Sequence, residues 1–422
     1  MPSPAAARSG VPAQLLVALA LLSALGPLSV DTYLPAFTTM ADDLSTSASA
    51  IQLTLTAFLF GLAAGQLVIG PLSDRFGRRQ PLLISIAICT LASVGAAASQ
   101  SVEPLIAFRF IQGFAAASGL VIGRSVVTDV SSGRAAVRAF SVLAAIGSFG
   151  PVVAPLLGGA LLPGIGWRGV LWVIAGATAL MTVGVALLVE ETLAPSRRST
   201  GGIAETVRTA RTHLGNRSYV SYLSISAFGF GAVLGYVAAS PFVLQNVFGL
   251  SSGAFSLAFA GNSVGLILAS LINARLVSRR QPARILEASQ LAMVVVSLAF
   301  AATVLTGVAT IHTVLPLTFL LITAIGFTLS NSGALAMVSV ARGTGTAAAL
   351  LGAIQFGFGA LVSPLVGLGG EDSATMMVVV ITGCALLGLA MLPVARRHPV
   401  HVSDHGSDQS AEWEATSALP GH

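Results

Sequence analysis

Charged residues are scarce in this chain. Asp, Glu, Lys and Arg make up only 9% of its 422 residues, whereas a soluble domain carries roughly 25%. Lysine is absent, so all 21 basic residues are arginines. Because 55% of the residues are hydrophobic and the mean hydropathy is +0.87, too little polar surface remains to keep the chain in water. The composition excludes an ordinary soluble protein and predicts that lipid surrounds most of the molecule.

Several chemical motifs are also missing. The two cysteines, Cys89 and Cys384, lie far apart in apolar segments, which predicts small core residues rather than a disulfide or a metal site. There is no Walker A sequence and no H-E-x-x-H. A G-x-S-x-G match at residues 261–265 lies inside an apolar segment instead of the strand–turn–helix that a nucleophile elbow needs, so it is a chance match. We expect no metal and no cofactor.

Long apolar runs recur along the chain, and each approaches the roughly 20 residues that cross a bilayer as a helix. The runs are continuously apolar, which favours helices over alternating strands. They predict an all-α membrane protein of twelve transmembrane helices, at about residues 14–36, 51–72, 81–99, 103–126, 137–162, 167–189, 219–245, 253–276, 284–306, 313–339, 345–369 and 374–394. The first run continues into Asp31, Tyr33 and Pro35 rather than a small-residue cleavage site, so we expect no cleaved signal peptide.

The arginines predict the orientation of these helices. If residues 1–13 are a cytoplasmic segment, nearly every loop arginine falls on the cytoplasmic side, and only Arg168 falls outside, with acidic Asp42, Asp43, Glu371 and Asp372. Both termini are then cytoplasmic. The net charge of +5 therefore reflects membrane topology, and we expect no nucleic-acid partner.

The longest hydrophilic stretch inside the chain divides it in two. Residues 14–189 form a first predicted six-helix bundle, 190–218 a cytoplasmic central loop and 219–394 a second bundle. The sequence RRQP follows the second and the eighth span, and APLLGG in the fifth span resembles SPLVGL in the eleventh. These matches, in register with the half-chain offset, indicate a duplicated transporter. Residues 395–422 form a polar tail that we expect to be cytoplasmic and disordered.

The loop after the second span reads GQLVIGPLSDRFGRR over residues 65–79, and here the chain resembles the major facilitator superfamily. It is more closely similar to the Bcr/CflA group of drug:proton antiporters, on four further stretches: DTYLPAF (31–37), RFIQGFAAASG (109–119), GSFGPVVAPLLGGAL (147–161) and GTGTAAALLGAIQFGFGALVSPLVG (343–367). The resemblance covers nearly the whole chain. It implies the major facilitator fold, with two pseudo-symmetric six-helix bundles.

The same loop motif holds a short acid–base pair, Asp74 and Arg78, between two glycines that allow tight packing. The resemblance implies that this loop latches the two halves in the outward-facing state, with partners at the cytoplasmic end of the fourth span. The alternative is that the charges only fix topology. The latch set is Gly70, Asp74, Arg75, Gly77, Arg78, Arg79, Arg124 and Asp129.

Asp31 is the one carboxylate that we place well inside a span, where a charge is costly and by default functional. It is our candidate for proton coupling, unless it lies close enough to the outer interface to be hydrated. Arg109, at nearly the same depth on the fourth span, is its candidate partner and would sense its protonation. The alternative for Arg109 is a role in topology or packing.

The fifth span is rich in glycine and proline, which bend a helix and let a neighbour pack on its backbone. By resemblance this antiporter helix also blocks proton leak, whereas simple membrane packing is the alternative. Its residues are Gly147, Gly150, Pro151, Pro155, Gly158 and Gly159. The substrate cavity should otherwise be apolar and aromatic, with candidate residues Tyr33, Phe58, Gln112, Tyr236, Phe242, Asn331, Gln355 and Phe356.

The sequence thus predicts a monomeric secondary transporter of the bacterial cytoplasmic membrane, with a proton gradient as its energy source. It would export small lipophilic drugs, amphenicol- or bicyclomycin-like antibiotics being first candidates by resemblance. The alternative is a proton-coupled transporter of a small endogenous metabolite. A membrane-embedded enzyme would need convergent catalytic groups within the spans, which the sequence lacks. A non-transporting receptor is distinguished only by flux across sealed vesicles.

Overall fold

The computed structural model describes residues 11–198, 202–340, 343–370 and 373–397. Sequence predictions about residues 1–10, Glu371, Asp372 and the tail beyond 397 lie outside these ranges. The first half holds α1 (Ala13–Asp31), η1 (Leu34–Ala36), α2 (Phe37–Asp43), α3 (Ala48–Phe76), α4 (Arg79–Ala97), α5 (Val102–Val130) and α6 (Gly133–Leu188). Then come η2 (Pro195–Arg197), α7 (Gly202–Gly215), α8 (Arg217–Phe242), η3 (Val243–Val247), α9 (Ser252–Leu276), α10 (Pro282–Leu305), α11 (Ile311–Val338), α12 (Thr344–Gly367) and α13 (Thr375–Arg397).

Within the described residues, 11 helices are long and apolar enough to cross a membrane. One of them, α6, has 56 residues, which at about 1.5 Å per residue is far longer than a bilayer core of about 30 Å. At Gly166 its backbone leaves the helical region, with φ 65° and ψ 176°, a conformation that favours glycine. The break divides α6 into two spans, so the predicted twelve spans are confirmed.

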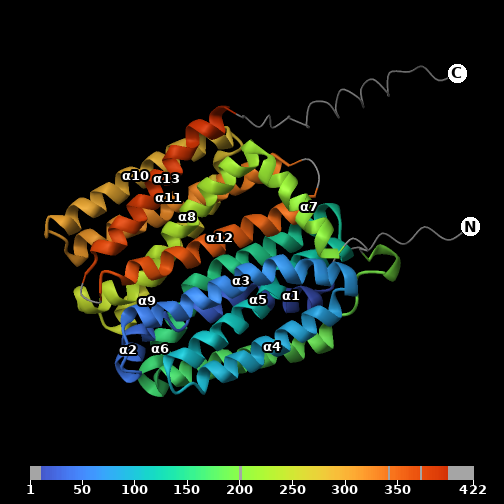
Figure 1. The fold of residues 1–422 in the computed structure, drawn as a ribbon, viewed down its shortest axis with the longest axis horizontal. Helices are drawn as coiled ribbons and strands as arrows, with labels where there is room; N and C mark the ends of the chain where they lie inside the picture. Colours follow the sequence, from blue (N-terminus) through green and yellow to red (C-terminus); the bar gives the residue numbers. More distant parts are fainter. Residues whose placement is uncertain (1–10, 199–201, 341–342, 371–372, 398–422) are drawn as a thin grey trace, which may run out of the picture.

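The two halves repeat the same helix pairs. In the first half α3 packs on α5, α4 on α5 and α1 on α6. The corresponding helices of the second half pack in the same way, α9 on α11, α10 on α11 and α8 on α12. The duplication predicted from short sequence echoes is therefore present in the packing. Figure 1 shows the first half, in blue to green, beside the second half, in yellow to red.

The halves touch along two seams, α3 with α12 and α6 with α9. Figure 1 shows α3 and α12 side by side through the middle of the molecule. The Ser49 hydroxyl donates to the Gly367 carbonyl (2.9 Å), and the Gln52 side chain donates to the Ala238 carbonyl (3.0 Å). Gln245 donates across the halves to the Pro35 carbonyl (3.3 Å). These bonds close the seam at the end of the bundle where α3 begins.

Small residues set the helix spacing in the first half. A Cβ atom on Gly61 or Gly65 would overlap backbone atoms of α5, and one on Gly113 would overlap the backbone of Phe58 on α3. Backbones can approach this closely only where side chains are absent, which is how helices associate in lipid. Gly61, Gly65 and Gly113 are therefore part of the contact surface between α3 and α5.

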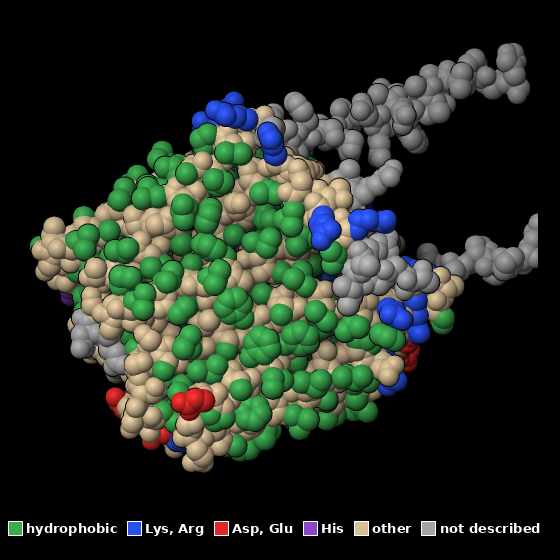
Figure 2. Space-filling view, viewed as in Figure 1, with side chains coloured by type: hydrophobic (Ala, Val, Ile, Leu, Met, Phe, Trp, Pro, Cys, Tyr) green, Lys and Arg blue, Asp and Glu red, His purple; other side chains and the backbone are tan. Residues whose placement is uncertain are grey.

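Charge is distributed unequally between the two ends of the bundle. Figure 2 shows a mostly apolar flank, with arginines gathered toward the end where α7 lies and acidic side chains toward the opposite end. Leucines such as Leu91, Leu180 and Leu187 are strongly exposed on this kind of surface, as expected for helices that face lipid. We call the end that carries Arg75, Arg78 and Arg79 the Arg-rich end, and the end that carries Asp43 and Arg168 the Asp43 end.

The structure adds detail at two predicted boundaries. The first predicted span, residues 14–36, lies within one apolar candidate span from Ala13 to Asp43, in which α1 ends at Asp31 and the chain turns before Pro35, whose nitrogen has no hydrogen to donate to a helix. The predicted central loop, residues 190–218, contains the helix α7, which packs on α3, α8 and α12. Its sequence gave no apolar run, and such a short polar helix depends on its neighbours for stability.

Candidate functional site

A mostly apolar cavity of about 250 Å³, which we call the central cavity, lies between the two halves. The first half lines it with residues of α1, α3, α5 and α6, and the second half with residues of α8, α9, α11 and α12. Pocket walls from both repeats are expected at the substrate site of a duplicated transporter. The lining residues include Pro27, Val30, Asp31, Phe58, Leu62, Leu120, Pro151, Phe230, Tyr236, Phe259, Asn262, Leu266 and Phe356.

Asp31 is the only charged residue on this cavity wall. It is the last residue of α1, is 6% exposed, and makes no hydrogen bond or ion pair with the described parts of the chain. A lone carboxylate in an apolar, membrane-embedded wall is costly to ionise unless water or a ligand reaches it. The sequence prediction that Asp31 is buried, rather than hydrated at the interface, therefore fits its geometry.

Arg109 is fully buried on α5, but it forms no ion pair with Asp31 among the described residues. Its guanidinium carbon lies 4.4 Å from the Tyr33 ring centroid and 4.5 Å from that of Phe58. Its Nη1 donates to Gln112, and its Nε and Nη2 have no partner in the described structure. The predicted contact with Asp31 is absent. Because Phe58 also lines the cavity, Arg109 lies directly behind the cavity wall.

The eight predicted cavity residues divide into two groups. Phe58, Tyr236 and Phe356 line the central cavity. The other five do not line the central cavity, and each contacts other side chains instead. Tyr33 and Gln112 pack on Arg109, Phe242 lies against Phe37, Asn331 donates to Asn273, and Gln355 donates to Ser226.

Sequence reasoning missed Asn262, which is buried in the cavity wall. Its side-chain amide donates to the Tyr236 hydroxyl (2.7 Å) and to the Thr318 hydroxyl (3.0 Å), and so joins α8, α9 and α11. The sequence contains an indication of this residue, because Asn262 lies in the apolar segment 261–265 that matches the G-x-S-x-G pattern by chance. A polar amide in the middle of an apolar span is itself an indication of a site.

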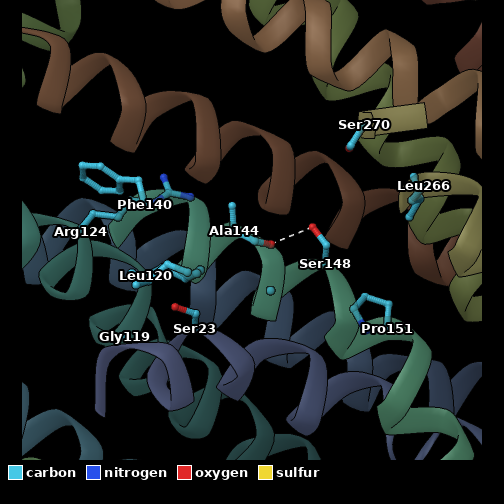
Figure 3. A pocket seen from close by; sticks show the side chains of 12 residues that line it. Ser23, Gly119, Leu120, Arg124, Phe140, Ala144, Ser148, Pro151, Leu266 and Ser270 are labelled. Carbon is cyan, nitrogen blue, oxygen red and sulfur yellow. Dashed lines mark hydrogen bonds between the residues drawn. The ribbon is translucent and has the colours of Figure 1, made fainter. Parts of the chain in front are cut away.

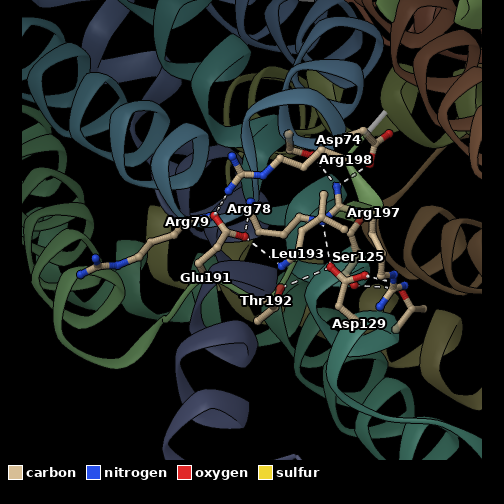
Figure 4. Close-up of polar contacts among 12 residues, drawn as sticks. Asp74, Arg78, Arg79, Ser125, Asp129, Glu191, Thr192, Leu193, Arg197 and Arg198 are labelled. Atoms are coloured by element: carbon tan, nitrogen blue, oxygen red, sulfur yellow. Dashed lines mark hydrogen bonds and ion pairs between the residues drawn. The ribbon is translucent and has the colours of Figure 1, made fainter. Parts of the chain in front are cut away.

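The loop motif forms an ion cluster at the Arg-rich end (Figure 4). Arg78 donates from Nε to Asp129 (2.9 Å) and from Nη1 to Asp74 (2.5 Å) and Ser73 (2.9 Å). Burial alone would lower the pKa of Arg78, but the bonds to Asp129 and Asp74 outweigh burial and raise it. The Arg78 and Asp129 side chains are almost fully buried, whereas that of Asp74 is 50% exposed. Asp74 is therefore the member of this cluster that is free to take another partner.

A third carboxylate, Glu191, completes the cluster from the start of the central loop. It accepts from the backbone nitrogens of Arg78 (2.8 Å) and Leu193 (2.9 Å), and it lies 3.9 Å from the Arg198 guanidinium. Burial alone would raise the pKa of Glu191, but these donors lower it. Gly77 has φ 98°, and a Cβ there would overlap this carboxylate. Sequence reasoning found Gly77 but not Glu191.

Four latch residues lie outside the contacts of Arg78. Arg79 donates to the Ala186 carbonyl (3.1 Å), Arg75 lies over the neighbouring Phe76 ring, and Gly70 faces Val121 on α5. Arg124 was predicted as a partner of the loop motif, but it makes no hydrogen bond or ion pair with the described residues. It lines a separate cavity instead.

That second cavity, which we call the vestibule, has a volume of about 600 Å³ and extends toward the Arg-rich end. Figure 3 shows Arg124 beside Phe140 at one end of it, with Ser148, Pro151, Leu266 and Ser270 toward the other. Leu120, Pro151 and Leu266 line both the vestibule and the central cavity. The two spaces are therefore neighbours, and on the Arg-rich side the vestibule separates α5 and α6 of the first half from α9 of the second, while α3 and α12 remain in contact.

The predicted antiporter helix is the first part of α6, between α1 and α9. A Cβ on Gly158 would overlap the Thr32 carbonyl, and one on Gly159 would overlap Ser256. Gly150 faces Pro27, Pro151 lines both cavities, and Pro155 is buried. In contrast, Gly147 faces open space. This helix thus packs backbone to backbone on Asp31's neighbour Thr32 and also forms the seam with the second half.

Residues 19–364 match the family model described as Major Facilitator Superfamily. An uncharacterized MFS-type transporter, YdgK of Bacillus subtilis (strain 168), is 39% identical over 376 residues, covering 88% of this chain and 92% of that protein. A bicyclomycin resistance protein homolog of Haemophilus influenzae is 28% identical, with coverages of 89% and 94%. Multidrug resistance protein MdtL of Klebsiella pneumoniae is 26% identical, with coverages of 92% and 96%. The crystal structure of a D-xylose-proton symporter is similar in fold, with a TM-score of 0.71, 16% identity and coverages of 91% and 98%.

Proposed function

The chain belongs to the Major Facilitator Superfamily and is a multi-pass membrane transporter rather than an enzyme, and we propose that it is a proton-driven antiporter exporting small lipophilic drugs. The observation that carries this proposal is Asp31, an unpaired carboxylate on the wall of an otherwise apolar cavity. An apolar wall suits a lipophilic substrate. The names of the bicyclomycin and multidrug resistance relatives support the same substrate class.

Coupling requires only that proton and drug bind unequally to the two conformations. In the proposed cycle, Asp31 takes up a proton when the cavity opens at the Asp43 end and loses it when the cavity opens at the Arg-rich end. The drug then binds to the cavity with Asp31 ionised. Arg109 acts through Phe58, because it lies over that ring while Phe58, and not Arg109, lines the cavity.

The ion cluster supports an alternating-access cycle. Its partners in this conformation all come from residues 73–198 of the first half and central loop. The half-exposed Asp74 is the proposed contact to the second half in the conformation that is closed at the Arg-rich end. Following the arginine bias, we propose that this end is cytoplasmic, in a bacterial inner membrane, and that the protein functions as a monomer.

Proton exchange by inside-out membrane vesicles tests the proposal. Vesicles from an efflux-deficient bacterium are acidified by respiration, and amphenicols, bicyclomycin or lipophilic cations are added while lumenal pH is followed by a fluorescent weak base. We expect a substrate drug to release protons with the wild-type protein but not with Asp31→Asn. Asp42→Asn, an exposed carboxylate away from the cavity, is the matched control and should behave as wild type.

Two outcomes would contradict the proposal. Full drug-induced proton release by Asp31→Asn, at equal membrane abundance, would remove Asp31 from coupling. The absence of proton release with every drug, for wild-type protein shown to be in the membrane, would favour transport of an endogenous metabolite.

A further inference from the structure

We propose that the vestibule is a binding site for an organic anion, with Arg124 as the group that binds the acid. Arg124 is the only charged residue among those that line the vestibule, and it forms no ion pair or hydrogen bond with the described chain. It lies on α5, six residues before the end of that helix at Val130, or about 9 Å along the axis. Arg124 is exposed within the vestibule, and a cation that faces a cavity inside a bundle of membrane-spanning helices without a partner indicates a ligand site.

Three serine hydroxyls also line the vestibule, and they differ in whether they can still donate to a ligand. Ser23 and Ser148 already donate their hydroxyl hydrogens to the carbonyls of Leu19 and Ala144. Ser270 makes no hydrogen bond with the described residues and is exposed, so its hydroxyl remains available as a donor. Arg124 belongs to the first half, and Ser270, toward the other end of the vestibule, belongs to the second (Figure 3). A ligand that binds Arg124 through its acid group and extends along the vestibule to Ser270 would therefore contact both halves.

The shape of the two cavities defines the rest of the ligand. Leu120, Pro151 and Leu266 form the boundary that the vestibule shares with the central cavity. Arg124 lies one helical turn, about 6 Å, from Leu120 along α5. An apolar or aromatic body could thus occupy the central cavity while its acid group reaches Arg124. The ligand class is an amphipathic organic anion of about 1 nm.

The position of Asp31 is compatible with this ligand. On α1 the vestibule residue Ser23 and the cavity residue Asp31 are eight residues apart, which is about 12 Å in a helix. The carboxylate and the acid group of the ligand would be separated by a similar distance, where repulsion is weak in a hydrated space. This inference rests on the proposed function and assigns its substrate class, adding acids to neutral lipophilic drugs.

A pair of fluorescent probes with the same aromatic body tests the site. 1-Anilinonaphthalene-8-sulfonate is an anion, and N-phenyl-1-naphthylamine is its uncharged counterpart. Binding is measured with purified full-length protein in nanodiscs of phosphatidylcholine, with the signal of empty nanodiscs subtracted. The variants are Arg124→Gln, Arg124→Lys and the control Arg134→Gln, since Arg134 is exposed at the same end and does not line the vestibule.

We expect Arg124→Gln to raise the Kd of the sulfonate by about tenfold, and that of the neutral probe by less than about twofold. Arg124→Lys keeps the charge and should retain most sulfonate binding, and Arg134→Gln should change neither Kd. Equal losses for both probes, or no Arg124-dependent sulfonate binding, would overturn the proposal. Retained binding of the neutral probe by Arg124→Gln excludes misfolding as the cause of its loss of sulfonate binding, and retained sulfonate binding by Arg124→Lys assigns that loss to the charge.

Phosphatidylglycerol distinguishes a free anion from a lipid headgroup. If adding this lipid to the nanodiscs displaces the sulfonate from wild-type protein but leaves the Arg124→Gln signal unchanged, the anion site is supported and a lipid is its resident ligand. If it does not displace the sulfonate, a soluble organic acid is supported. Export of the neutral probe that depends on Asp31 but not on Arg124 would support the proposed function independently of the sulfonate result, so failure of the anion site is distinguishable from failure of the proposed function.

Discussion

The geometry of the ion cluster predicts that Asp129 contributes more than Asp74 to the free energy of unfolding. Arg78 binds both, but Asp129 is buried with it at 2.9 Å, whereas Asp74 is half exposed. At an effective dielectric constant of about 20, an ion pair at this distance gains about 6 kcal/mol before desolvation is subtracted. Breaking a buried pair by removing one partner costs about 3–5 kcal/mol, whereas exposed pairs contribute about 0–1 kcal/mol. Because Arg78 keeps Asp74 and Ser73, Asp129→Asn should cost about 3 kcal/mol and Asp74→Asn less than about 1 kcal/mol.

The assay is the midpoint of thermal unfolding in detergent, followed by size-exclusion chromatography of the heated protein. The fall in midpoint should be at least about three times larger for Asp129→Asn than for Asp74→Asn. Asp74→Asn should reduce drug transport far more than it reduces thermal stability, because it removes the proposed contact to the second half without unfolding the protein. Equal thermal shifts, or normal transport by Asp74→Asn at normal abundance, would refute this reasoning.

Two further predictions concern packing and pH. Gly158→Ala should destabilise the protein by on the order of 1–3 kcal/mol, because its Cβ would overlap the Thr32 carbonyl. Gly147→Ala, which meets no atom within 4 Å, should be close to neutral in thermal stability and transport; equal effects would contradict the packing argument. The pKa of Glu191 is lowered from its ordinary value of 4.5. Its carboxylate therefore contributes fully to the free energy of unfolding above pH 4.5, and this contribution is lost as the pH falls below 4.5. Thermal unfolding between pH 7 and pH 3.5 should therefore depend less steeply on pH in Glu191→Gln, and superimposable profiles would disprove the linkage.

The architecture was predictable because hydrophobicity and arginine placement act over whole segments. Twelve spans and two related halves follow from run length and from the repeated RRQP sequence. The Asp74 and Arg78 pair was also predictable, because these opposite charges are only four residues apart at the junction of two spans. These features depend on local sequence or on counts, and no knowledge of side-chain direction is needed for them.

The direction of each side chain inside the membrane could not be predicted. A membrane helix is apolar on the face toward lipid and on the face toward protein, so hydrophobic periodicity does not distinguish them. This is why Tyr33 and Gln112 were expected in the cavity but lie on Arg109, and why Arg124 was expected in the ion cluster but faces the vestibule. Glu191 escaped detection for another reason, since 113 residues separate it from Arg78.

The single carboxylate on the central cavity wall limits the gradient that the proposed antiporter can maintain. A cycle with one protonatable group imports one proton per neutral molecule exported. Moving one charge through 100 mV yields about 2.3 kcal/mol, and one unit of pH difference adds about 1.4 kcal/mol. Together they sustain at most about a 500-fold concentration ratio across the membrane. Cells that rely on this protein would therefore tolerate external drug up to about that multiple of the internal concentration that inhibits growth.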